Sequence, residues 1–526
     1  MLFQKLYQLL KREAPSHPLR GEENTIRMAS LPLGGAGGGL WSVWGGSFIL
    51  LLLSACTSHP TNPEQSDALP PIYPDYIGVT IPVGIAPLNF SVEGNDVERV
   101  DVTVTGQNGA TLHTNGKTAQ FDIEDWHQLL EENKGSELSV SVCTKENGKW
   151  KQYQDFTISV SSLPLDEWGL TYRRIAPGYE VYSHMGIYQR NLSNFDEEAI
   201  IDNTQVPGAC FNCHTANRTN PKQMVFHVRG ENGATVMQID GKREILKASN
   251  ETLGGSMVYP YWHPSGEYCA FSTNTTRQSF HVVPDERIEV FDLASDILVY
   301  HPKTHEILTD SLISRPDWSE NTPVFSPDGK TLYFLTCQQQ EYPSHFKDEK
   351  YNLCKIAFDP TTCHFGNHVD TVFNAIGMGK SLTWPRPSYD GKYLLFTLMD
   401  YGYFSIWHKE SEQWLMNLST GESRNLSEIN SDDADSYHNW SANSHWIVFT
   451  SRRGDGLYTR LYLSSIDEKG HFSKPFLLPQ KNPKEYYNES LYSFNTPDFT
   501  NTHVSFNSHL AAQEILTPHR VETKMK

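Results

Sequence analysis

A repeated unit in the last 300 residues constrains the fold more than any other feature of this sequence. Five segments share a short polar turn, then alternating apolar residues, then an aromatic residue. They are "YWHPSGEYCAFST" (Tyr261 to Thr273), "VFSPDGKTLYFLT" (Val324 to Thr336), "RPSYDGKYLLFTL" (Arg386 to Leu398), "NWSANSHWIVFTS" (Asn439 to Ser451) and "TPDFTNTHVSFNS" (Thr496 to Ser508). This pattern is typical of a turn that leads into a half-buried strand. Consecutive units start about 53 to 63 residues apart, enough for four strands and their loops.

The segment "SPDG", Ser326 to Gly329, resembles the repeat signature of the TolB-like, WD-type β-propellers. The segment from Asp435 to Gly456 follows the same pattern, with His438 where proline is usual. The resemblance covers roughly the last 300 residues and implies a propeller over residues 224–518. Five units and one further strand pair at residues 224–246 predict six blades, with seven as the alternative, closed by pairing between the two ends of the repeat region.

A separate small β domain is predicted at residues 72–162. Three segments alternate with period two, and one short helical patch lies between them. The segments are "RVDVTVTG" (Arg99 to Gly106), "ELSVSVCT" (Glu137 to Thr144) and "DFTISVSS" (Asp155 to Ser162). An immunoglobulin-like β-sandwich is the simplest interpretation. The predicted fold class is therefore all-β, with a tether at residues 57–71 before the sandwich and a separate segment at 163–223 before the propeller.

The N-terminal segment has the features of an export signal. The apolar stretch from Leu40 to Leu53 is shorter than the roughly 20 residues of a membrane span, but it suits the apolar core of a signal peptide. Leu53 to Cys56 resembles the bacterial lipobox, which implies a signal peptide over residues 1–56, a lipid anchor on Cys56 and an extracytoplasmic location on the periplasmic face or the outer membrane. An uncleaved anchor helix is the alternative.

The charge of the chain limits the class of partner. The formal net charge is −19, and no basic run is present. Nucleic-acid binding needs clustered Lys and Arg to neutralise phosphates, so nucleic acid is excluded as a partner. We expect the bacterial membrane and a redox or scaffold protein instead.

The segment "CFNCH", Cys210 to His214, matches the C-x-x-C-H pattern of c-type haem attachment. In that chemistry Cys210 and Cys213 form thioether bonds, and His214 is the proximal iron ligand. Three alternatives remain: a zinc site, which lacks a second ligand pair at suitable spacing, a thioredoxin-like pair, which normally begins a helix, and a strained disulfide. The predicted cofactor is one covalent haem c.

The second iron ligand is harder to predict. Residues 163–223 are too few for an independent cytochrome c domain, so the propeller or the sandwich has to enclose the haem. In the predicted strand "QMVFHVRG", His227 and Arg229 share one face. We predict His227 as the distal ligand and Arg229 as a propionate partner. The alternatives for the distal ligand are Met224, His184 and Met185.

Other chemistry is weakly indicated. No G-x-S-x-G motif follows the propeller, which excludes the peptidases that pair a propeller with a hydrolase domain. Cys354 and Cys363 flank an Asp-Pro turn that could bring them together as a hairpin disulfide, which an exported location permits. For these two and for Cys143, Cys269 and Cys337 the favoured interpretation is a structural cysteine, and the disulfide pairing stays open.

Three functions follow from these features. The first is an envelope-anchored c-type haem lipoprotein that transfers electrons or has another cytochrome-related redox role; similar propeller lipoproteins are often labelled as cytochrome c biogenesis proteins. The second is a TolB-like scaffold that binds a periplasmic or surface protein or a glycan, with haem structural or absent. The third is a haem enzyme such as a peroxidase, which needs an open sixth position on the iron. The sequence has no catalytic motif beyond the haem site.

Overall fold

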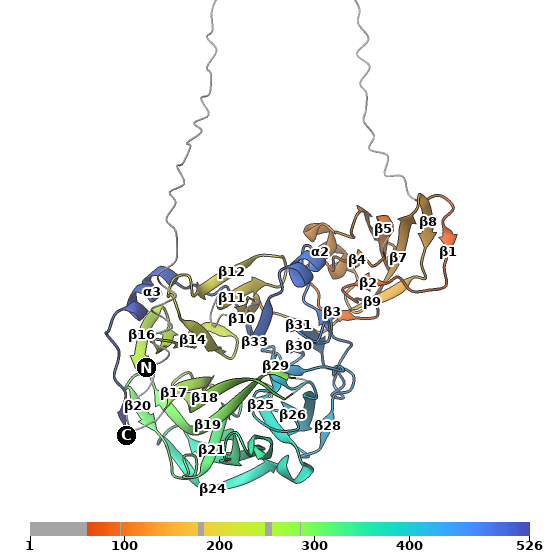
Figure 1. Ribbon diagram of the computed structural model, residues 1–526. Helices are drawn as coiled ribbons and strands as arrows, with labels where there is room; N and C mark the ends of the chain where they lie inside the picture. The colour runs from red at the N-terminus through yellow and green to blue at the C-terminus, as the bar shows by residue number, and fades with distance from the viewer. Residues whose placement is uncertain (1–59, 95, 177–183, 248–254, 284–285) are drawn as a thin grey trace, which may run out of the picture. The chain divides into compact units, whose positions relative to one another are not determined.

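The computed structural model describes residues 60–94, 96–176, 184–247, 255–283 and 286–526. The predicted signal peptide and Cys56 lie outside these residues. Residues Thr57–Lys526 form one compact unit. Strands make up most of its regular structure (Figure 1), which confirms the predicted all-β class.

The N-terminal domain, predicted as an immunoglobulin-like sandwich, has one large sheet and one two-stranded ladder. The large sheet contains β1 (Glu64–Gln65), β3 (Thr80–Ile81), β5 (Val97–Gly106), β6 (Thr111–Gly116), β7 (Glu137–Glu146), β8 (Lys149–Gln152) and β9 (Phe156–Val160), and the ladder contains β2 (Ile72–Tyr73) and β4 (Ser91–Val92). Helix α2 (Ile123–Glu132) begins at Asp122, whose side chain caps two backbone N–H groups. It buries Trp126, Leu129 and Leu130, which lie at helical spacing.

The remaining described strands form six antiparallel sheets, which we call blades 1 to 6 (Figure 1). Blade 1 contains β33 (Ser493–Thr500), β10 (Gly169–Ile175), β11 (Met185–Asn191) and β12 (Glu197–Asp202); blade 2 contains β13 (Cys210–Asn217), β14 (Asn220–Arg229), β15 (Ala234–Ile239) and β16 (Lys242–Lys247); blade 3 contains β17 (Ser256–Trp262), β18 (Cys269–Val283), β19 (Glu286–His301) and β20 (Glu306–Leu308). Blade 4 contains β21 (Trp318–Phe325), β22 (Thr331–Gln338), β23 (Asn352–Asp359) and β24 (His364–Phe373); blade 5 contains β25 (Ser381–Pro387), β26 (Tyr393–Met399), β27 (Glu412–Asn417) and β28 (Ser423–Asn425); blade 6 contains β29 (Asp435–Trp440), β30 (Trp446–Ser451), β31 (Arg460–Ser465) and β32 (Phe476–Leu477).

The strand named first in each blade lies innermost. Innermost strands of neighbouring blades contact one another, and together they form a closed ring. The short helices η1 (Phe346–Asp348), η2 (Ile376–Met378), η3 (Ser405–Trp407) and η4 (Glu485–Glu489) lie in loops between strands. Six antiparallel sheets with this connectivity make a six-bladed β-propeller, which confirms the predicted fold and the preferred blade count.

The ring closes in blade 1, where the C-terminal strand β33 pairs with β10. Closure between the two ends of the repeat region was expected, but the propeller begins earlier in the chain than residue 224. Residues 163–223, expected as a separate segment, supply β10, β11 and β12 of blade 1 and β13 of blade 2. The C-x-x-C-H motif therefore lies on an innermost propeller strand.

Each innermost strand contains a β-bulge at the same position. Two consecutive residues have no partner in the ladder, and the first of them has a positive φ between 43° and 52°. The six dipeptides are Thr496-Pro497, Cys213-His214, Tyr259-Pro260, Thr322-Pro323, Trp384-Pro385 and Tyr437-His438. Because the bulge leaves the second residue out of the ladder, proline is acceptable there, and four blades have it.

A buried aromatic residue lies opposite every bulge, on the second strand of the blade. These residues are Tyr172, Phe226, Phe271, Phe334, Phe396 and Phe449, and none is more than 1% exposed. They include the aromatic residues that end the first four repeat units of the sequence; in the fifth unit Phe506 follows β33 outside any strand and packs against Phe226. The repeat is therefore explained by one packing unit: a bulge on the inner strand and an aromatic ring on its neighbour.

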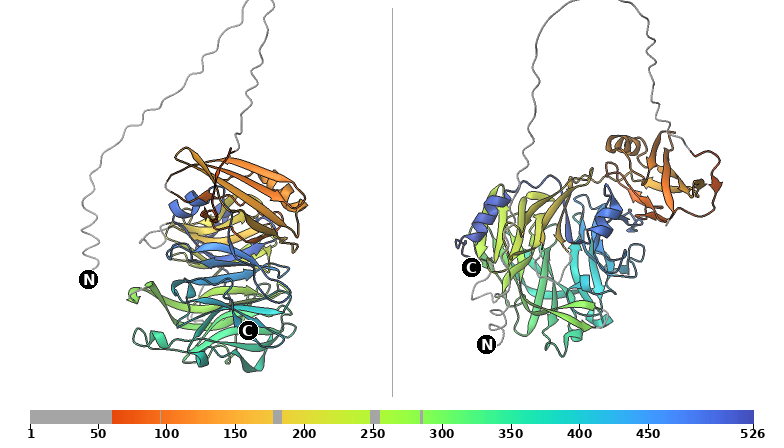
Figure 2. Two further views of the ribbon diagram at one scale, coloured as in Figure 1. Left: turned by 90° about the vertical axis from the view of Figure 1, so that its right-hand side faces the viewer. Right: turned by 45° about the horizontal axis from the view of Figure 1, so that its top comes forward.

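The C-terminal segment after β33 packs along the outside of blades 2 and 3. Helix α3 (Ser508–Leu516) lies beside blade 2, where Arg243 forms an ion pair with Glu514 (Figures 1 and 2). The last strand, β34 (Lys524–Met525), pairs with β20 of blade 3. This segment extends the sheets at their outer edge and covers edges that would otherwise be open.

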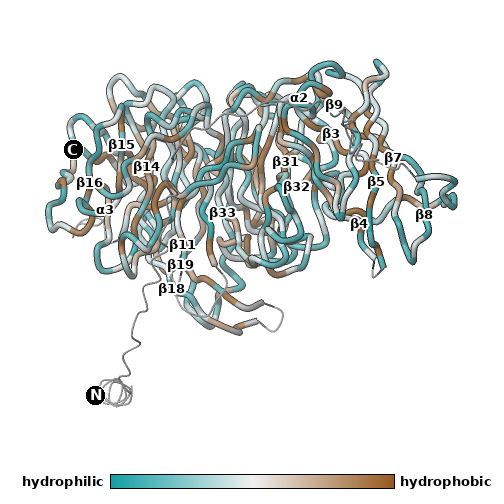
Figure 3. The backbone as a smooth tube through the Cα atoms, turned by 90° about the horizontal axis from the view of Figure 1, so that it is seen from above, coloured by the Kyte–Doolittle hydropathy of each residue, from teal (hydrophilic) through white to brown (hydrophobic). Residues whose placement is uncertain are grey.

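Blade 3 has a longer hairpin than the other blades. Strands β18 and β19, of 15 and 16 residues, form a hairpin that extends beyond the neighbouring strands (Figure 3). Cys354 and Cys363 do not form the hairpin disulfide that was the alternative for them: both thiols are free. Cys354 lies opposite Thr371 in the ladder, whereas Cys363 lies in the turn before β24, where its sulfur is 2.6 Å from the Tyr268 hydroxyl.

Candidate functional site in the central chamber

The largest enclosed space near the motif is a chamber of about 470 Å³ inside the ring of innermost strands. Residues of β13, β17, β25, β29 and β33 line it, together with residues of β10, β14, β18 and β19 and of the segment that contains η3. The first residues of the bulges in blades 1, 2, 3, 5 and 6 all face it. The repeated bulge therefore directs one side chain from each of these blades toward the same space.

The chamber is positively charged. Arg173, Arg229 and Arg386 line it, and no Asp or Glu is among its described lining residues. The Arg386 guanidinium stacks over Trp384 at 4.1 Å and lies 5.4 Å from the Tyr261 ring centre. Three arginines in one chamber of a chain with net charge −19 favour an anionic ligand, because guanidinium groups bind carboxylates and phosphates with paired hydrogen bonds.

All three residues of the motif border this chamber. Cys210 and Cys213 are 2% and 4% exposed. Arg173 Nη2 lies 3.2 Å from Cys210 Sγ. Burial raises the pKa of the Cys213 thiol, and Arg229 partly offsets that shift. Cys213 is therefore a protonated, weakly nucleophilic thiol at neutral pH.

The separation of the two cysteines along β13 restricts their chemistry. They are three residues apart on a strand, which spans about 10 Å at about 3.3 Å per residue and less where the bulge shortens it. A disulfide needs Cα atoms about 4.4–6.8 Å apart, so it would require the strand to rearrange. The two sulfurs are free in the structure. This arrangement disfavours the dithiol and disulfide alternatives and suits attachment to two separate points of one ligand.

The His214 imidazole lies at the boundary of blades 1 and 2. Its Nδ1 is 3.5 Å from Thr171 Oγ1, and its Nε2 is 3.4 Å from Thr496 Oγ1. These contacts are at the outer limit of hydrogen-bond length and hence weak. Burial lowers the pKa of His214 to about 4, so the ring is neutral at pH 7. A neutral imidazole is the form that binds a metal.

The structure does not bring His227 to the chamber. His227 is 2% exposed, its Nδ1 lies 3.2 Å from Thr235 Oγ1, and it is absent from the chamber wall. Burial lowers its pKa to about 3. Arg229, on the same face two residues later, does line the chamber. His227 and Arg229 were predicted to line the ligand site together. Only Arg229 reaches the chamber, because β14 is the second strand of its blade.

The other predicted distal ligands lie in different places. Met224 packs in the apolar core with Phe211. The His184 ring lies 6.3 Å from Tyr492. Met185 is linked to the motif through Arg173, whose Nη2 lies 3.6 Å from the Met185 sulfur and also contacts Cys210 Sγ.

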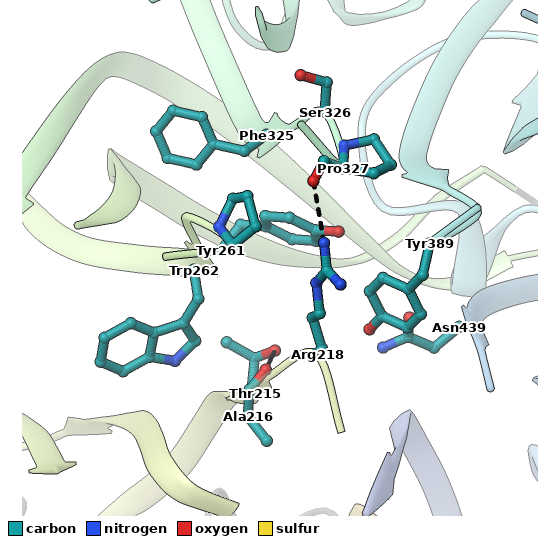
Figure 4. Close-up of a pocket in the computed structure, with 11 residues that line it drawn as sticks. Thr215, Ala216, Arg218, Tyr261, Trp262, Phe325, Ser326, Pro327, Tyr389 and Asn439 are labelled. Carbon is teal, nitrogen blue, oxygen red and sulfur yellow. Dashed lines mark hydrogen bonds between the residues drawn. The ribbon is translucent and has the colours of Figure 1, made fainter. Parts of the chain in front are cut away.

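The other end of the innermost strands is closed. A pocket there, with about 10 Å³ of space, is crossed by Arg218 (Figure 4). Arg218 Nη2 donates a hydrogen bond to the Pro327 carbonyl at 2.9 Å, and its guanidinium lies 5.6 Å from the Tyr389 ring centre. This pocket has room for about one water molecule, whereas the chamber has room for a larger ligand.

The motif residues are compatible with a covalent haem. The chamber combines two separated thiols, a neutral imidazole, aromatic side chains and three arginines that could face propionates. Among the described residues, no group of three or more His, Cys, Asp or Glu side chains is placed to hold a metal ion on its own. No helix in the described part of the chain is long and apolar enough to cross a membrane.

No protein-family model and no curated protein matches the chain. Solved structures similar to it include TolB from Acinetobacter baumannii, with 14% identity over 72% of this chain and 86% of that chain and a TM-score of 0.41. Others are an oligogalacturonate lyase from Vibrio parahaemolyticus (10% identity, 54% and 84% covered, TM-score 0.32) and a hypothetical selenium-binding protein from Sulfolobus tokodaii (8% identity, 79% and 96% covered, TM-score 0.37). All three TM-scores are below 0.5, so the propeller assignment rests on the sheet topology described above.

Sequence reasoning missed that the motif is itself part of a repeat unit. Cys213 precedes the aromatic Phe226 by 13 positions, and Tyr259 precedes Phe271 by 12. The sequence signal that could have revealed this is an aromatic residue 12 or 13 positions after the first residue of the bulge. It also missed Arg173 and Arg386, which come from blades 1 and 5 and which no local pattern connects with the motif.

Proposed function

We propose that the propeller is a binding scaffold whose central chamber holds an anionic ligand, and that this ligand is a haem attached through Cys210 and Cys213. The observation that carries the proposal is that both thiols and His214 border one chamber that also contains three arginines. When bound, haem would supply one-electron redox chemistry. The function would then be electron transfer, with the propeller enclosing the cofactor.

The roles of the chain's own residues follow from their positions. Cys210 and Cys213 hold the ligand covalently at two points, and His214 presents a neutral imidazole beside them. Arg229, Arg173 and Arg386 would neutralise the propionate carboxylates of the haem, which would otherwise be buried without a counter-charge. Met185 would be a better candidate than His227 for a second iron ligand, because Arg173 contacts both the Met185 sulfur and Cys210 Sγ, whereas the His227 ring contacts Thr235.

A second candidate is a scaffold without haem, in which the chamber binds a carboxylate-bearing ligand such as an acidic glycan, or the propeller binds a protein. The supporting observation is that Cys213-His214 occupies the bulge position filled by X-Pro in four other blades. The dipeptide therefore has a structural role that needs no haem.

We also propose that the protein is anchored in the bacterial envelope through a lipid on Cys56 and works outside the cytoplasm. This placement is where covalent haem is attached in bacteria, and the proposal rests on the lipobox-like sequence. Palmitate labelling of the wild-type protein, lost in Cys56→Ala, tests it.

The decisive experiment is the mass and absorption spectrum of the protein made in a host with an active cytochrome maturation system. A gain of one haem, about 616 Da, on the peptide with Cys210 and Cys213, together with a sharp reduced α band, supports the haem proposal. Unmodified thiols and no haem absorption would reject it and leave the second candidate. The Met185→Ala and His227→Ala variants then identify the second ligand from the shift of the Soret band.

A further inference from the structure

Two buried carboxylates lie together between blades 3 and 4. Asp292 of β19 is 1% exposed, and Glu349, which follows η1, is 2% exposed. Neither forms an ion pair with a Lys, Arg or His side chain of the described residues. A buried carboxylate without a counter-charge is strongly destabilising, so this arrangement calls for either a proton or a bound cation.

Hydrogen bonds place the two carboxylates in one cluster. Asp292 Oδ2 accepts from Asn274 Nδ2 at 2.8 Å, from Asn321 Nδ2 at 2.6 Å and from the Tyr351 hydroxyl at 3.4 Å. The Tyr342 hydroxyl lies 2.6 Å from Glu349 Oε2 and 3.2 Å from the Asp292 carbonyl oxygen. Tyr342 thus joins the two acidic residues.

Three buried oxygens of this cluster have no hydrogen-bond partner: Asp292 Oδ1, Glu349 Oε1 and Asn274 Oδ1. The Ser295 hydroxyl lies close enough to Asp292 to offset, by hydrogen bonding, part of the rise that burial causes in the pKa of that carboxyl. Asn274 points toward Asp292, because its amide nitrogen donates to that carboxylate, and Ser295 is its partner in the β18–β19 ladder. Unsatisfied buried oxygens are rare in native proteins, and three in one neighbourhood indicate a missing ligand with positive charge.

We propose that Asp292 and Glu349, with Asn274 and Ser295, bind a divalent cation of the Ca²⁺ class. All the available ligand atoms are carboxylate, amide and hydroxyl oxygens, which hard cations prefer, and two carboxylates balance the charge of one such ion. The Cys337 thiol is buried beside Glu349 and Tyr351, but burial and the Glu349 charge raise its pKa well above the ordinary value, so it stays protonated. No thiolate is therefore available to favour zinc or copper. Water would complete the six to eight ligands that Ca²⁺ takes.

The location of the cluster agrees with this site. Asn274 also lines the chamber, so the site lies next to a space that connects it with the interior of the ring. The site is independent of the ligand in the chamber.

Thermal unfolding of the full-length protein in EGTA and in saturating CaCl₂ tests the proposal. We expect Ca²⁺ to raise Tm by about 3 °C or more, since a ligand that binds only the folded state stabilises it. Asp292→Asn and Glu349→Gln should each lose this shift and weaken Ca²⁺ binding by about tenfold or more. Tb³⁺, titrated as a luminescent probe, should be sensitised by Tyr342 and Tyr351, and Ca²⁺ should displace it.

The matched control is Asp498→Asn. Asp498 is also buried, and burial raises its pKa to about 7, but both of its oxygens have partners in Thr215, the Ala216 N–H group and Asn439. This variant should keep the Ca²⁺ shift.

The proposal is overturned if the wild-type protein shows no Ca²⁺ shift and Glu349→Gln is more stable than wild type, because the two groups are then neutral acids. Should the variants fail to fold, the metal content of wild-type protein dialysed against metal-free buffer decides the question. About one equivalent of calcium supports the site, and none rejects it.

Discussion

Blades 2 and 6 carry a histidine at the same position of their innermost strands, yet only one of the two borders the chamber. His214 follows Cys213, and His438 follows Tyr437, each as the second residue of a bulge. His214 has two threonine hydroxyls within 3.5 Å. His438 is 0% exposed, and neither of its ring nitrogens has a partner.

The comparison shows that the bulge sets the position of the histidine, whereas the neighbouring side chains determine which contacts its ring makes. In blade 6 the second bulge residue packs toward blade 5, where Trp384 Nε1 donates to the His438 carbonyl at 3.1 Å. In blade 2 it packs toward blade 1, beside Thr171 and Thr496. A histidine at this position is therefore no evidence for a ligand by itself. What distinguishes blade 2 is the pair of cysteines and the arginines that face them.

The largest expected effect comes from giving blade 2 the bulge of another blade. Cys213→Thr combined with His214→Pro reproduces the Thr-Pro dipeptides of blades 1 and 4. We expect a folded protein that has lost all two-point covalent haem, because one thiol and the imidazole are gone while the bulge geometry is kept. Intact mass, the absorption spectrum and circular dichroism measure this. A variant that does not fold would show that Cys213-His214 is needed for the blade itself.

The next effect is the acid sensitivity that His438 gives to blade 6. Burial lowers the pKa of His438 to about 3, from about 6.5 in the unfolded chain. At pH 7.5 both states are neutral; as pH falls below 6.5 only the unfolded chain gains the proton, so stability is lost. At pH 5 this amounts to about 2 kcal/mol.

His438→Gln should remove that part of the acid sensitivity. Urea unfolding of wild type and variant at pH 7.5 and pH 5 checks it, and the difference between the two proteins is the relevant quantity. Carboxyls with raised pKa values, such as Asp498, act in the opposite direction in both proteins. Equal pH dependence of wild type and variant would contradict a neutral, buried His438.

A smaller effect tests how much Arg229 contributes to the binding of haem in the chamber. Haemin titrated into protein made without the maturation system should bind about tenfold more weakly to Arg229→Gln, because one charge-assisted contact is lost. The Soret band gives the affinity. Arg218→Gln, at the closed end of the ring, is the control and should bind haemin as wild type does; equal weakening in both variants would contradict binding in the chamber.

The smallest effect is expected in blade 6. His438→Pro gives this blade the residue found in four others, outside the ladder, so no ladder hydrogen bond is lost. We expect a gain of about 0.5–1 kcal/mol at pH 7.5, because proline restricts the unfolded chain. Urea unfolding measures it, and a loss above about 1 kcal/mol would show that the imidazole fills its site better than its unpaired nitrogens indicate.

Local patterns were sufficient for most of the fold. The turn, the alternating run and the terminal aromatic predicted the blades because each blade repeats one packing unit that can be recognised in a short window. Local reasoning left the pairing of Cys354 and Cys363 open, and only the register of β23 and β24, which sets Cys354 opposite Thr371, excludes it. Local reasoning also separated residues 163–223 from the propeller, because closure pairs β10 with a strand more than 300 residues later.

By itself, the sequence determined the all-β class, the repeated blades and the unusual C-x-x-C-H segment, because these depend on the order of neighbouring residues. Only the tertiary structure decided what surrounds that segment. Closing the ring brings Arg173 and Arg386 to Cys210 and Cys213 from separate blades and leaves His227 outside the chamber. Such convergence depends on how whole sheets pack around a centre, and that information is not contained in any single stretch of the chain.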